Sequence, residues 1–329
     1  MLQDQFGREH NYLRLSLTER CNLRCFYCMP AEGVPLSPKD HIMSTEEIET
    51  IAGTFVKMGV NKIRFTGGEP LLRKDFANVA ERLSKFNCEL AVTTNGILVD
   101  QYLQTFKDTG IKKINVSLDT LDESKFNSIT RRDYFKRVMS NIELLFTHGF
   151  VPKINVVVIK NVNDNELIDF INLTKEWPTT VQFIEFMPFS GNKWDLTQTV
   201  RSEQILEAAN LYFGKNNISK IQDKANDTSR KYGVNSYKGN FGLISTVSNP
   251  FCDSCNRIRL TANGRIKNCL FSQGETDLLK AVRAGEDLEQ LIRESIYNKK
   301  SKRGGIQDFS SESGILKAQE NRSMVMIGG

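Results

Sequence analysis

The 329-residue chain has few histidines and no long apolar run. None of its three histidines (His10, His41 and His148) is close enough in sequence to a cysteine to complete a metal site there. No apolar run approaches the ~20 residues that span a membrane, and the N-terminus lacks a basic-plus-apolar signal peptide. These absences predict a cytoplasmic protein with no membrane partner. A Walker-type phosphate loop is also missing, so side chains are expected to hold any anion.

The net charge and the cysteine pattern exclude further classes of protein. The formal net charge is +5 and the pI is about 8.7, a mild excess that suits a small anionic substrate and not a nucleic acid. Seven cysteines in a chain of this length do not indicate a disulfide framework. Six of them fall into two tight groups, and Cys88 stands alone as a predicted buried strand residue.

The first group, Cys21, Cys25 and Cys28, has C-x3-C-x2-C spacing within eight residues. A [4Fe–4S] cluster normally takes four cysteine thiolates, so three would leave one iron open to another ligand. A structural zinc site is normally coordinated by four Cys or His ligands, commonly as paired C-x2-C units. The spacing favours an iron–sulfur cluster and leaves zinc as the alternative.

The second group, Cys252, Cys255 and Cys269, also offers only three thiols, at C-x2-C-x13-C spacing. A second open cluster is favoured, with zinc or unlinked thiols as alternatives. Arg257 and Arg259 lie between these cysteines, and alternate residues of an extended segment point the same way. Their guanidinium groups match phosphate and carboxylate geometry, which predicts an anionic ligand beside the cluster.

Strands and helices alternate over the first 190 residues. The capping box of Ser44 and Glu47 starts the first helix, which ends at Gly59. Six strands are expected at 11–17, 62–66, 89–93, 113–118, 152–159 and 181–186. Further helices are expected at 75–85, 100–109, 123–129, 135–147 and 166–174. This alternation predicts parallel βαβ units with a site beyond the carboxyl ends of the strands.

The periodicity weakens after Gly191. The strand at 181–186 is predicted to be the last clear one, and residues 215–237 are predicted to form a loop. We therefore divide the chain into a barrel domain at 1–190 and a C-terminal region at 191–329. Gly67 and Gly68 follow a predicted strand, where they let the backbone approach a ligand closely.

The first cysteine loop resembles the signature of the radical S-adenosylmethionine (SAM) superfamily, and the Gly67–Pro70 segment resembles the part that binds the SAM amino group. This resemblance implies an α/β fold, a partial (β/α)6 radical SAM barrel open on one side, here with a C-terminal extension carrying a second iron–sulfur cluster. It also implies that SAM binds the open iron and is cleaved reductively to a 5′-deoxyadenosyl radical.

Within that superfamily, almost the whole chain resembles the GTP 3′,8-cyclase family. The segments that carry the resemblance are 14–28, 64–70, 93–96, 115–119, Lys153, 183–188, 252–269 and the terminal 327–329. The family often has an arginine where this chain has Gln182, which puts one anion contact in doubt.

The resemblance implies conversion of GTP to 3′,8-cyclo-7,8-dihydro-GTP in the first step of molybdenum cofactor biosynthesis. The implied GTP contacts are Arg14, Arg64, Thr93, Lys153, Arg257 and Arg259. The implied SAM contacts are Tyr27, Gly68, Ser117 and Met187. The implied ligands of two [4Fe–4S] clusters are Cys21, Cys25, Cys28, Cys252, Cys255 and Cys269. A tail ending in Gly328 and Gly329 is expected to reach the site.

The implied partners are a flavodoxin- or ferredoxin-like reductant, the downstream cyclic pyranopterin monophosphate synthase and a second copy in a homodimer. The alternatives are a radical SAM peptide maturase, an RNA-modifying radical SAM enzyme and a non-catalytic zinc-binding scaffold. Peptide maturases usually carry more C-terminal cysteines, and no appended basic domain indicates RNA binding.

Overall fold

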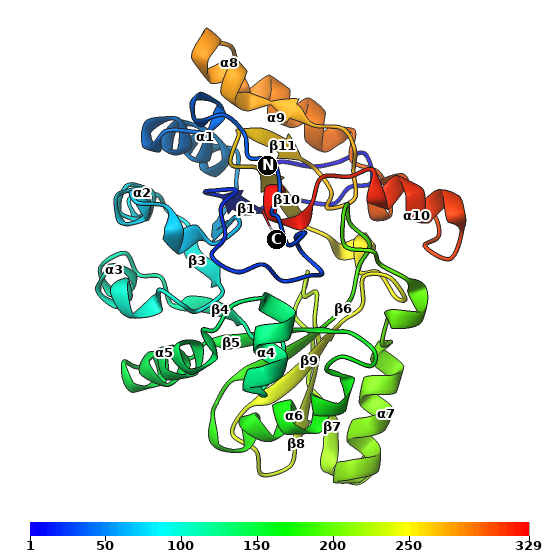
Figure 1. Ribbon diagram of the computed structural model, residues 1–329. Coiled ribbons are helices and arrows are strands. Elements are labelled where there is room, and N and C mark those ends of the chain that lie inside the picture. Colours follow the sequence, from blue (N-terminus) through cyan, green and yellow to red (C-terminus); the bar gives the residue numbers. More distant parts are fainter. Residues whose placement is uncertain (329) are drawn as a thin grey trace.

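A single twelve-stranded sheet runs through the computed structural model, which describes residues 1–328 (Figure 1). Its strand order is β12-β11-β10-β1-β2-β3-β4-β5-β6-β9-β8-β7. The parallel strands are β1 Tyr12–Ser16, β2 Lys62–Thr66, β3 Glu89–Thr94, β4 Lys113–Ser117, β5 Lys153–Val158, β6 Thr180–Glu185, β9 Asn240–Ile244 and β10 Arg257–Leu260. Antiparallel strands extend both ends: β7 Ile218–Lys220, β8 Arg230–Val234, β11 Arg265–Lys267 and β12 Thr276–Asp277.

Helices follow most of the strands and cover the outer side of the curved sheet, while the C-terminal segment lies inside the curve (Figure 1). In the barrel part they are α1 Thr45–Lys57, α2 Phe76–Ser84, α3 Leu103–Asp108, α4 Glu123–Thr130, α5 Phe135–Thr147 and α6 Leu167–Glu176. Later come α7 Ser202–Phe213, α8 Leu278–Ala284, α9 Leu288–Tyr297 and α10 Glu312–Gln319. No helix within residues 1–328 is long and apolar enough to cross a membrane.

Side-chain alternation along β1 separates the core from the interior of the barrel. Leu13 and Leu15 are fully buried in the main hydrophobic core, which they share with Phe55 of α1. Arg14, between them, lines the interior cavity instead. Because successive strand residues point to opposite faces, the apolar set faces the helices and the charged set faces inward.

The predicted open barrel is confirmed, but it has more strands than the predicted six. Strand β10 pairs with β1 at one edge, and β9 pairs with β6 at the other. Both strands come from the C-terminal region, so the prediction that 181–186 is the last clear strand is wrong. The boundary at residue 190 stays a prediction.

Three local predictions differ from the structure. Residues 215–237 do not form a mere loop, because β7 and β8 pair there as a hairpin. The helix expected at 100–109 is split into a 3-10 turn at Val99–Gln101 and the short α3. Cys88 is half-buried in a bend that precedes β3, and not in the strand itself. Such short strands carry too few residues to show an alternating pattern.

The capping box of α1 has the predicted geometry. The Ser44 hydroxyl accepts from the Glu47 backbone at 3.2 Å, and the Glu47 carboxylate accepts from the Ser44 backbone at 2.7 Å. We expect Ser44→Ala to lower the free energy of unfolding by about 1 kcal/mol, because the backbone N–H of Glu47 loses its hydrogen-bond acceptor. Anaerobic urea unfolding followed by circular dichroism measures this change.

Thr50→Ala is the matched control on the same helix. The Thr50 side chain is exposed and donates only to the Glu46 carbonyl oxygen at 2.9 Å. We expect its stability to stay within about 0.5 kcal/mol of the parent. Equal midpoints for Ser44→Ala and the parent would show that the box does not stabilise α1.

Candidate active site

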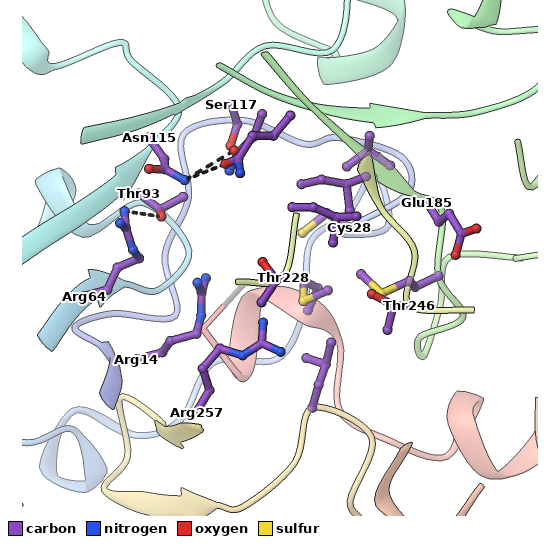
Figure 2. Close-up of a pocket in the computed structure, with 18 of the residues that line it drawn as sticks. Arg14, Cys28, Arg64, Thr93, Asn115, Ser117, Glu185, Thr228, Thr246 and Arg257 are labelled. Carbon is purple, nitrogen blue, oxygen red and sulfur yellow. Dashed lines mark hydrogen bonds between the residues drawn. The ribbon is translucent and has the colours of Figure 1, made fainter. Parts of the chain in front are cut away.

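One cavity of about 470 Å³ occupies the interior of the barrel (Figure 2). All six grouped cysteines line it, and so do all the residues predicted to contact GTP or SAM. Figure 2 shows Arg14, Arg64 and Arg257 on one side of the cavity, with Cys28 and Glu185 across from them. The structure therefore brings the sequence-predicted residues together, while their individual roles stay predictions.

The two cysteine groups lie at opposite ends of the parallel strands. Cys21 follows β1 and so belongs to the carboxyl end. Cys255 precedes β10, which is parallel to β1, and Cys269 follows the antiparallel β11. The second group therefore belongs to the amino end, and the cavity joins both ends. The sequence predicted a site beyond the carboxyl ends of the strands, and the cavity extends to their amino ends as well.

The loop of Cys21, Cys25 and Cys28 is fixed from several sides. The backbone N–H groups of Arg24 and Phe26 donate to carbonyl oxygens at the end of α4, at 2.9 and 3.1 Å. The Asn95 amide donates to Cys21 Sγ at 3.9 Å, and the Val325 backbone N–H contacts Cys28. The loop is thus held in place by the protein itself.

The first three thiols lie in surroundings that oppose thiolate formation. Burial, reinforced by Glu69, raises the pKa of Cys21 to about 11. Burial and Cys21 raise the pKa of Cys28 to about 12, and burial with Asp119 raises the pKa of Cys25 well above its usual value. Thiolates here need a bound positive group, which fits iron ligation.

Gly67 and Gly68 are required by close backbone contact. A Cβ at Gly67 would lie 2.5 Å from the Thr18 carbonyl oxygen, and one at Gly68 would lie 2.2 Å from that of Arg20. The same Cβ at Gly68 would lie 3.0 Å from Val325 of the tail. Glycine therefore lets this turn pack directly beneath the cysteine loop.

Glu69 connects two loops through hydrogen bonds to its side chain. Its buried carboxylate accepts from the Thr94 hydroxyl at 2.8 Å and from the Asn95 and Leu71 backbones at 2.7 and 3.1 Å. Burial raises its pKa to about 7, against the effect of these donors. The Glu69 carboxylate therefore already has three donors from the protein itself.

Asp119 connects the cysteine loop to the sheet. The Tyr27 hydroxyl donates to one of its carboxylate oxygens at 2.5 Å, and the Val157 backbone donates to the other at 2.8 Å. Burial raises the Asp119 pKa to about 6, although both donors act against that rise. Tyr27 is thereby oriented along the wall that Ser117 and Met187 also line.

A row of cations lines the cavity. Arg14 on β1 is in register with Arg64 on β2 and with Arg259 on β10. The Arg64 guanidinium donates hydrogen bonds to the Tyr12 hydroxyl at 2.6 Å and to the Thr93 hydroxyl at 3.3 Å. We call Arg14, Arg64, Arg257, Arg259 and Lys153 the cation row, since all five line the same space.

The cation row is electrostatically crowded. Burial, with Arg64 and Arg257 nearby, lowers the Arg14 pKa to about 10. Burial and neighbouring cations lower the Lys153 pKa to about 8 and bring that of Arg259 well below its usual value. A bound polyanion would relieve this repulsion.

In the second cysteine group, Cys255 has the opposite electrostatic surroundings. Burial acts to raise the Cys255 pKa, but Arg257 and Lys299 outweigh it and lower the value to about 6. The Arg257 guanidinium lies 3.7 Å from Cys255 Sγ, and the Arg303 backbone donates to Cys252 Sγ at 3.4 Å. The Cys255 thiol is thus favoured as a thiolate, whereas burial raises the pKa of Cys252.

A mononuclear zinc site gains no support from the geometry. Among residues 1–328, no three His, Cys, Asp or Glu side chains converge closely enough to hold one metal ion. A cubane cluster distributes its thiolates over several irons, so its cysteines need not converge on one point. For the second group, the choice between a cluster and zinc stays a prediction.

The C-terminal tail enters the cavity. Met324 and Val325 line it, and Ile327 is fully buried. Arg259 donates to the carbonyl oxygen of Gly328. A Cβ added to Gly328 would lie 2.7 Å from the Thr66 hydroxyl oxygen. Gly328 also has a φ of 76°, which favours glycine. Gly329, the other predicted tail residue, lies outside the described residues.

Comparison with known proteins gives the family. The Radical SAM superfamily model matches residues 15–174, and the Molybdenum Cofactor Synthesis C model matches residues 179–304. GTP 3′,8-cyclase of Clostridium botulinum (strain Langeland / NCTC 10281 / Type F) is 41% identical over 330 residues, which cover 99% of both chains. The chain belongs to the GTP 3′,8-cyclase family.

Other relatives are similar over most of this chain. Mitochondrial GTP 3′,8-cyclase of Arabidopsis thaliana is 42% identical over 100% of this chain and 84% of that protein. Molybdenum cofactor biosynthesis protein moc-5 of Caenorhabditis elegans is 43% identical, and the match covers 94% of this chain but 52% of that protein. The chain thus spans about half the length of that relative.

The fold also matches a solved radical SAM structure. Streptococcus suis SuiB bound to S-adenosylmethionine superimposes with a TM-score of 0.63 at 16% identity, covering 95% of this chain and 72% of that one. This likeness concerns the fold alone. Membership of the radical SAM superfamily implies a [4Fe–4S] cluster and SAM, and the first cysteine loop is where these residues would hold them.

Several cavity residues were not predicted from the sequence. Tyr12 and Lys62 lie two positions before Arg14 and Arg64 on the same strand faces, so period-2 alternation could have indicated them. Asp227 and Lys231, which form an ion pair at 2.7 Å near Lys153, come from the hairpin segment predicted as a loop. Gln182 lines the cavity without charge, so it supplies no cation there.

Anion binding should weaken above pH 8. Lys153 must be protonated to attract an anion, and its pKa of about 8 means that the free protein loses this charge as pH rises through that value. Tyr12 acts in the same direction: burial opposes its ionisation, but nearby cations lower its pKa to about 8. We expect affinity for inorganic triphosphate to fall by up to about tenfold per pH unit for each proton taken up.

Isothermal titration calorimetry below and above that pH measures the change. Lys153→Arg keeps its charge and should remove the part of the pH dependence due to the lysine. Tyr12→Phe should remove the part due to the phenolate. An affinity that stays constant through this range in the parent protein would contradict the assigned ionisations.

Proposed function

We propose that the chain is a radical SAM GTP 3′,8-cyclase, which converts GTP to 3′,8-cyclo-7,8-dihydro-GTP in the first step of molybdenum cofactor biosynthesis. The observation that carries the proposal is the cation row between two cysteine groups at opposite ends of one cavity. The relatives named GTP 3′,8-cyclase support the choice of substrate.

A nucleoside triphosphate matches the charge of the cavity. A triphosphate carries about four negative charges, and charge-assisted contacts to guanidinium groups are among the stronger hydrogen bonds. Arg14, Arg64, Lys153, Arg257 and Arg259 would supply these contacts, with the Thr93 hydroxyl beside Arg64. The guanine base would then reach the second cluster at Cys252, Cys255 and Cys269.

SAM would lie near the first cysteine loop, against Tyr27, Gly68, Ser117 and Met187. Reduction of SAM at the cluster there supplies a 5′-deoxyadenosyl radical. The wall that Tyr27 and Asp119 fix would orient the methionine and ribose parts toward the cation row. No general acid or base is assigned, because the protein's part is binding and positioning.

The reaction needs one hydrogen atom removed and one returned. Hydrogen is abstracted from C3′ of GTP, and the carbon radical left there attacks C8 of the guanine. One electron and one proton then complete the product, which is an isomer of GTP. The cation row, which lines the interior cavity, would hold the ribose still during these steps.

The proposal extends to the partners and the location. A flavodoxin- or ferredoxin-like protein would deliver electrons, and cyclic pyranopterin monophosphate synthase would take the product. We further propose a homodimer in the cytoplasm. The mild net charge of +5 agrees with a small anionic substrate and no nucleic-acid partner.

Formation of 5′-deoxyadenosine is the first test. Anaerobically reconstituted, reduced protein should form it with SAM only when GTP is present, and GTP should be consumed into a cyclised product. Chromatography with mass detection measures both. ATP, CTP and inorganic triphosphate are the comparison ligands, because they share the anionic groups but not the guanine.

Other outcomes separate the alternatives. Equal cleavage of SAM without GTP would keep the radical chemistry and reject GTP as the substrate. No cleavage by protein that holds both clusters would favour a non-catalytic scaffold. A second experiment addresses the cation row itself.

Arg257→Ala should weaken GTP binding about 10- to 100-fold, because it removes one charge-assisted contact. Its guanidinium lines the cavity and also packs on the Phe251 ring at 4.5 Å. Both clusters should still assemble, as judged by iron and sulfide content. Equilibrium dialysis with labelled GTP measures the affinity.

Arg265→Ala is the matched control on the neighbouring strand β11. The Arg265 side chain is 42% exposed and pairs with Asp277 at 3.4 Å, outside the cavity. Its removal should leave GTP affinity unchanged. Parent-like affinity in a fully loaded Arg257→Ala protein would remove Arg257 from the substrate site.

A further inference from the structure

Lys299 is a buried lysine directly behind the second cysteine group. It follows α9, where its backbone N–H donates to the Ile296 carbonyl oxygen at 3.0 Å. Only 2% of its surface is exposed. Its ammonium donates to Cys255 Sγ at 3.5 Å and to the Arg257 carbonyl oxygen at 2.9 Å.

This ammonium has no carboxylate partner among residues 1–328. Its hydrogen bonds go to the Cys255 sulfur and to one backbone carbonyl oxygen. A buried charge without a counter-charge is strongly destabilising. The sulfurs of the second group are therefore the anionic partner that this position requires.

The nearby acid Asp4 already has other partners. Asp4 accepts from the Arg8 guanidinium at 2.7 Å and lies 2.9 Å from the His10 ring. Arg8 also donates to the carbonyl oxygens of Cys252 and Ser301, at 2.8 and 2.7 Å. This network ties the segment after Lys299 to the Cys252 turn and so fixes the ammonium against the sulfur.

We propose that Lys299 is a positioning residue for the second iron–sulfur cluster, whose Cys255 sulfur its ammonium hydrogen-bonds and whose reduction potential it raises. The inference rests on the second cluster of the proposed function. Hydrogen bonds to cluster sulfurs and local charge set such potentials. A fixed positive charge favours the reduced state, because that state is the more negative one.

The first group differs, because the cation beside Cys21, Arg24, donates to the backbone carbonyl oxygens of Cys21 and Leu23 at 2.6 and 2.9 Å. The charged side chains that raise its thiol pKa values are Glu69 and Asp119, both acids. Lys299 should therefore affect one cluster and leave the other unchanged. The first cluster then serves as an internal reference in the same molecule.

The test is a potentiometric titration of full-length holoenzyme, followed by electron paramagnetic resonance. Addition of SAM identifies the first cluster by the change in its signal. In Lys299→Met, the second cluster should be half-reduced at a more negative potential, and the first should stay at the parent value. Iron and sulfide content must equal those of the parent.

Two variants act as controls. Lys299→Arg keeps the charge and donors and should restore most of the parent potential. Lys300→Met removes the adjacent exposed lysine and should change neither cluster. An unchanged second-cluster potential in loaded Lys299→Met would overturn the proposal, and so would an equal shift in Lys300→Met.

Poor cluster loading would still decide the question. If Lys299→Met and Lys299→Gln both lose the second cluster while Lys299→Arg keeps it, the need for the charge supports the proposal. If Lys299→Arg loses it as well, the role is one of packing and the proposal falls. A parent protein with iron only at the first group would instead refute the second cluster itself, which separates the two failures.

Discussion

The register of three paired strands fixes three arginines side by side. Arg64, Arg14 and Arg259 follow from the alignment of β2, β1 and β10, and neighbouring strands lie about 4.8 Å apart. The backbone ladder prevents the side chains' attachment points from separating, so their repulsion cannot relax by movement of the strands. An anion placed among them converts that repulsion into attraction without any rearrangement of the sheet. The cavity is therefore organised for an anion before one binds.

The two ends of the cavity differ in what their thiols need. Near Cys21, Cys25 and Cys28, buried acids oppose negative sulfur, so the charge of a bound cluster must stabilise the thiolates. Near Cys255, Arg257 and Lys299 already stabilise it. One barrel thus creates two different electrostatic environments for the same ligand type. Such a difference is what two clusters with separate tasks would require.

Local patterns predicted much of this architecture. The Ser44 capping box and the strand at 62–66 were predicted at their observed positions, because both depend on neighbouring residues. The pairing of β9 and β10 with the barrel edges joins segments far apart in the chain, and a single sequence has no signal for it. Lys299 meets Cys255 across 44 positions, so no local pattern in the sequence indicates the contact. Motif spacing identified the ligands, whereas the groups that tune them depend on tertiary contacts.

The tail connects both ends of the site. Val325 contacts Cys28 of the first loop and packs on Gly68, while Gly328 accepts from Arg259 of the cation row. One short segment therefore depends on the cysteine loop, the glycine turn and the strand that carries the second group's arginines. Because a Cβ at Gly328 would meet Thr66, the chain can lie this close only as glycine. The Gly328 carbonyl oxygen occupies one of the five N–H donors of Arg259, and because it is neutral it does not compensate the guanidinium charge. The tail can therefore hold the arginine in place while its charge still attracts an anion.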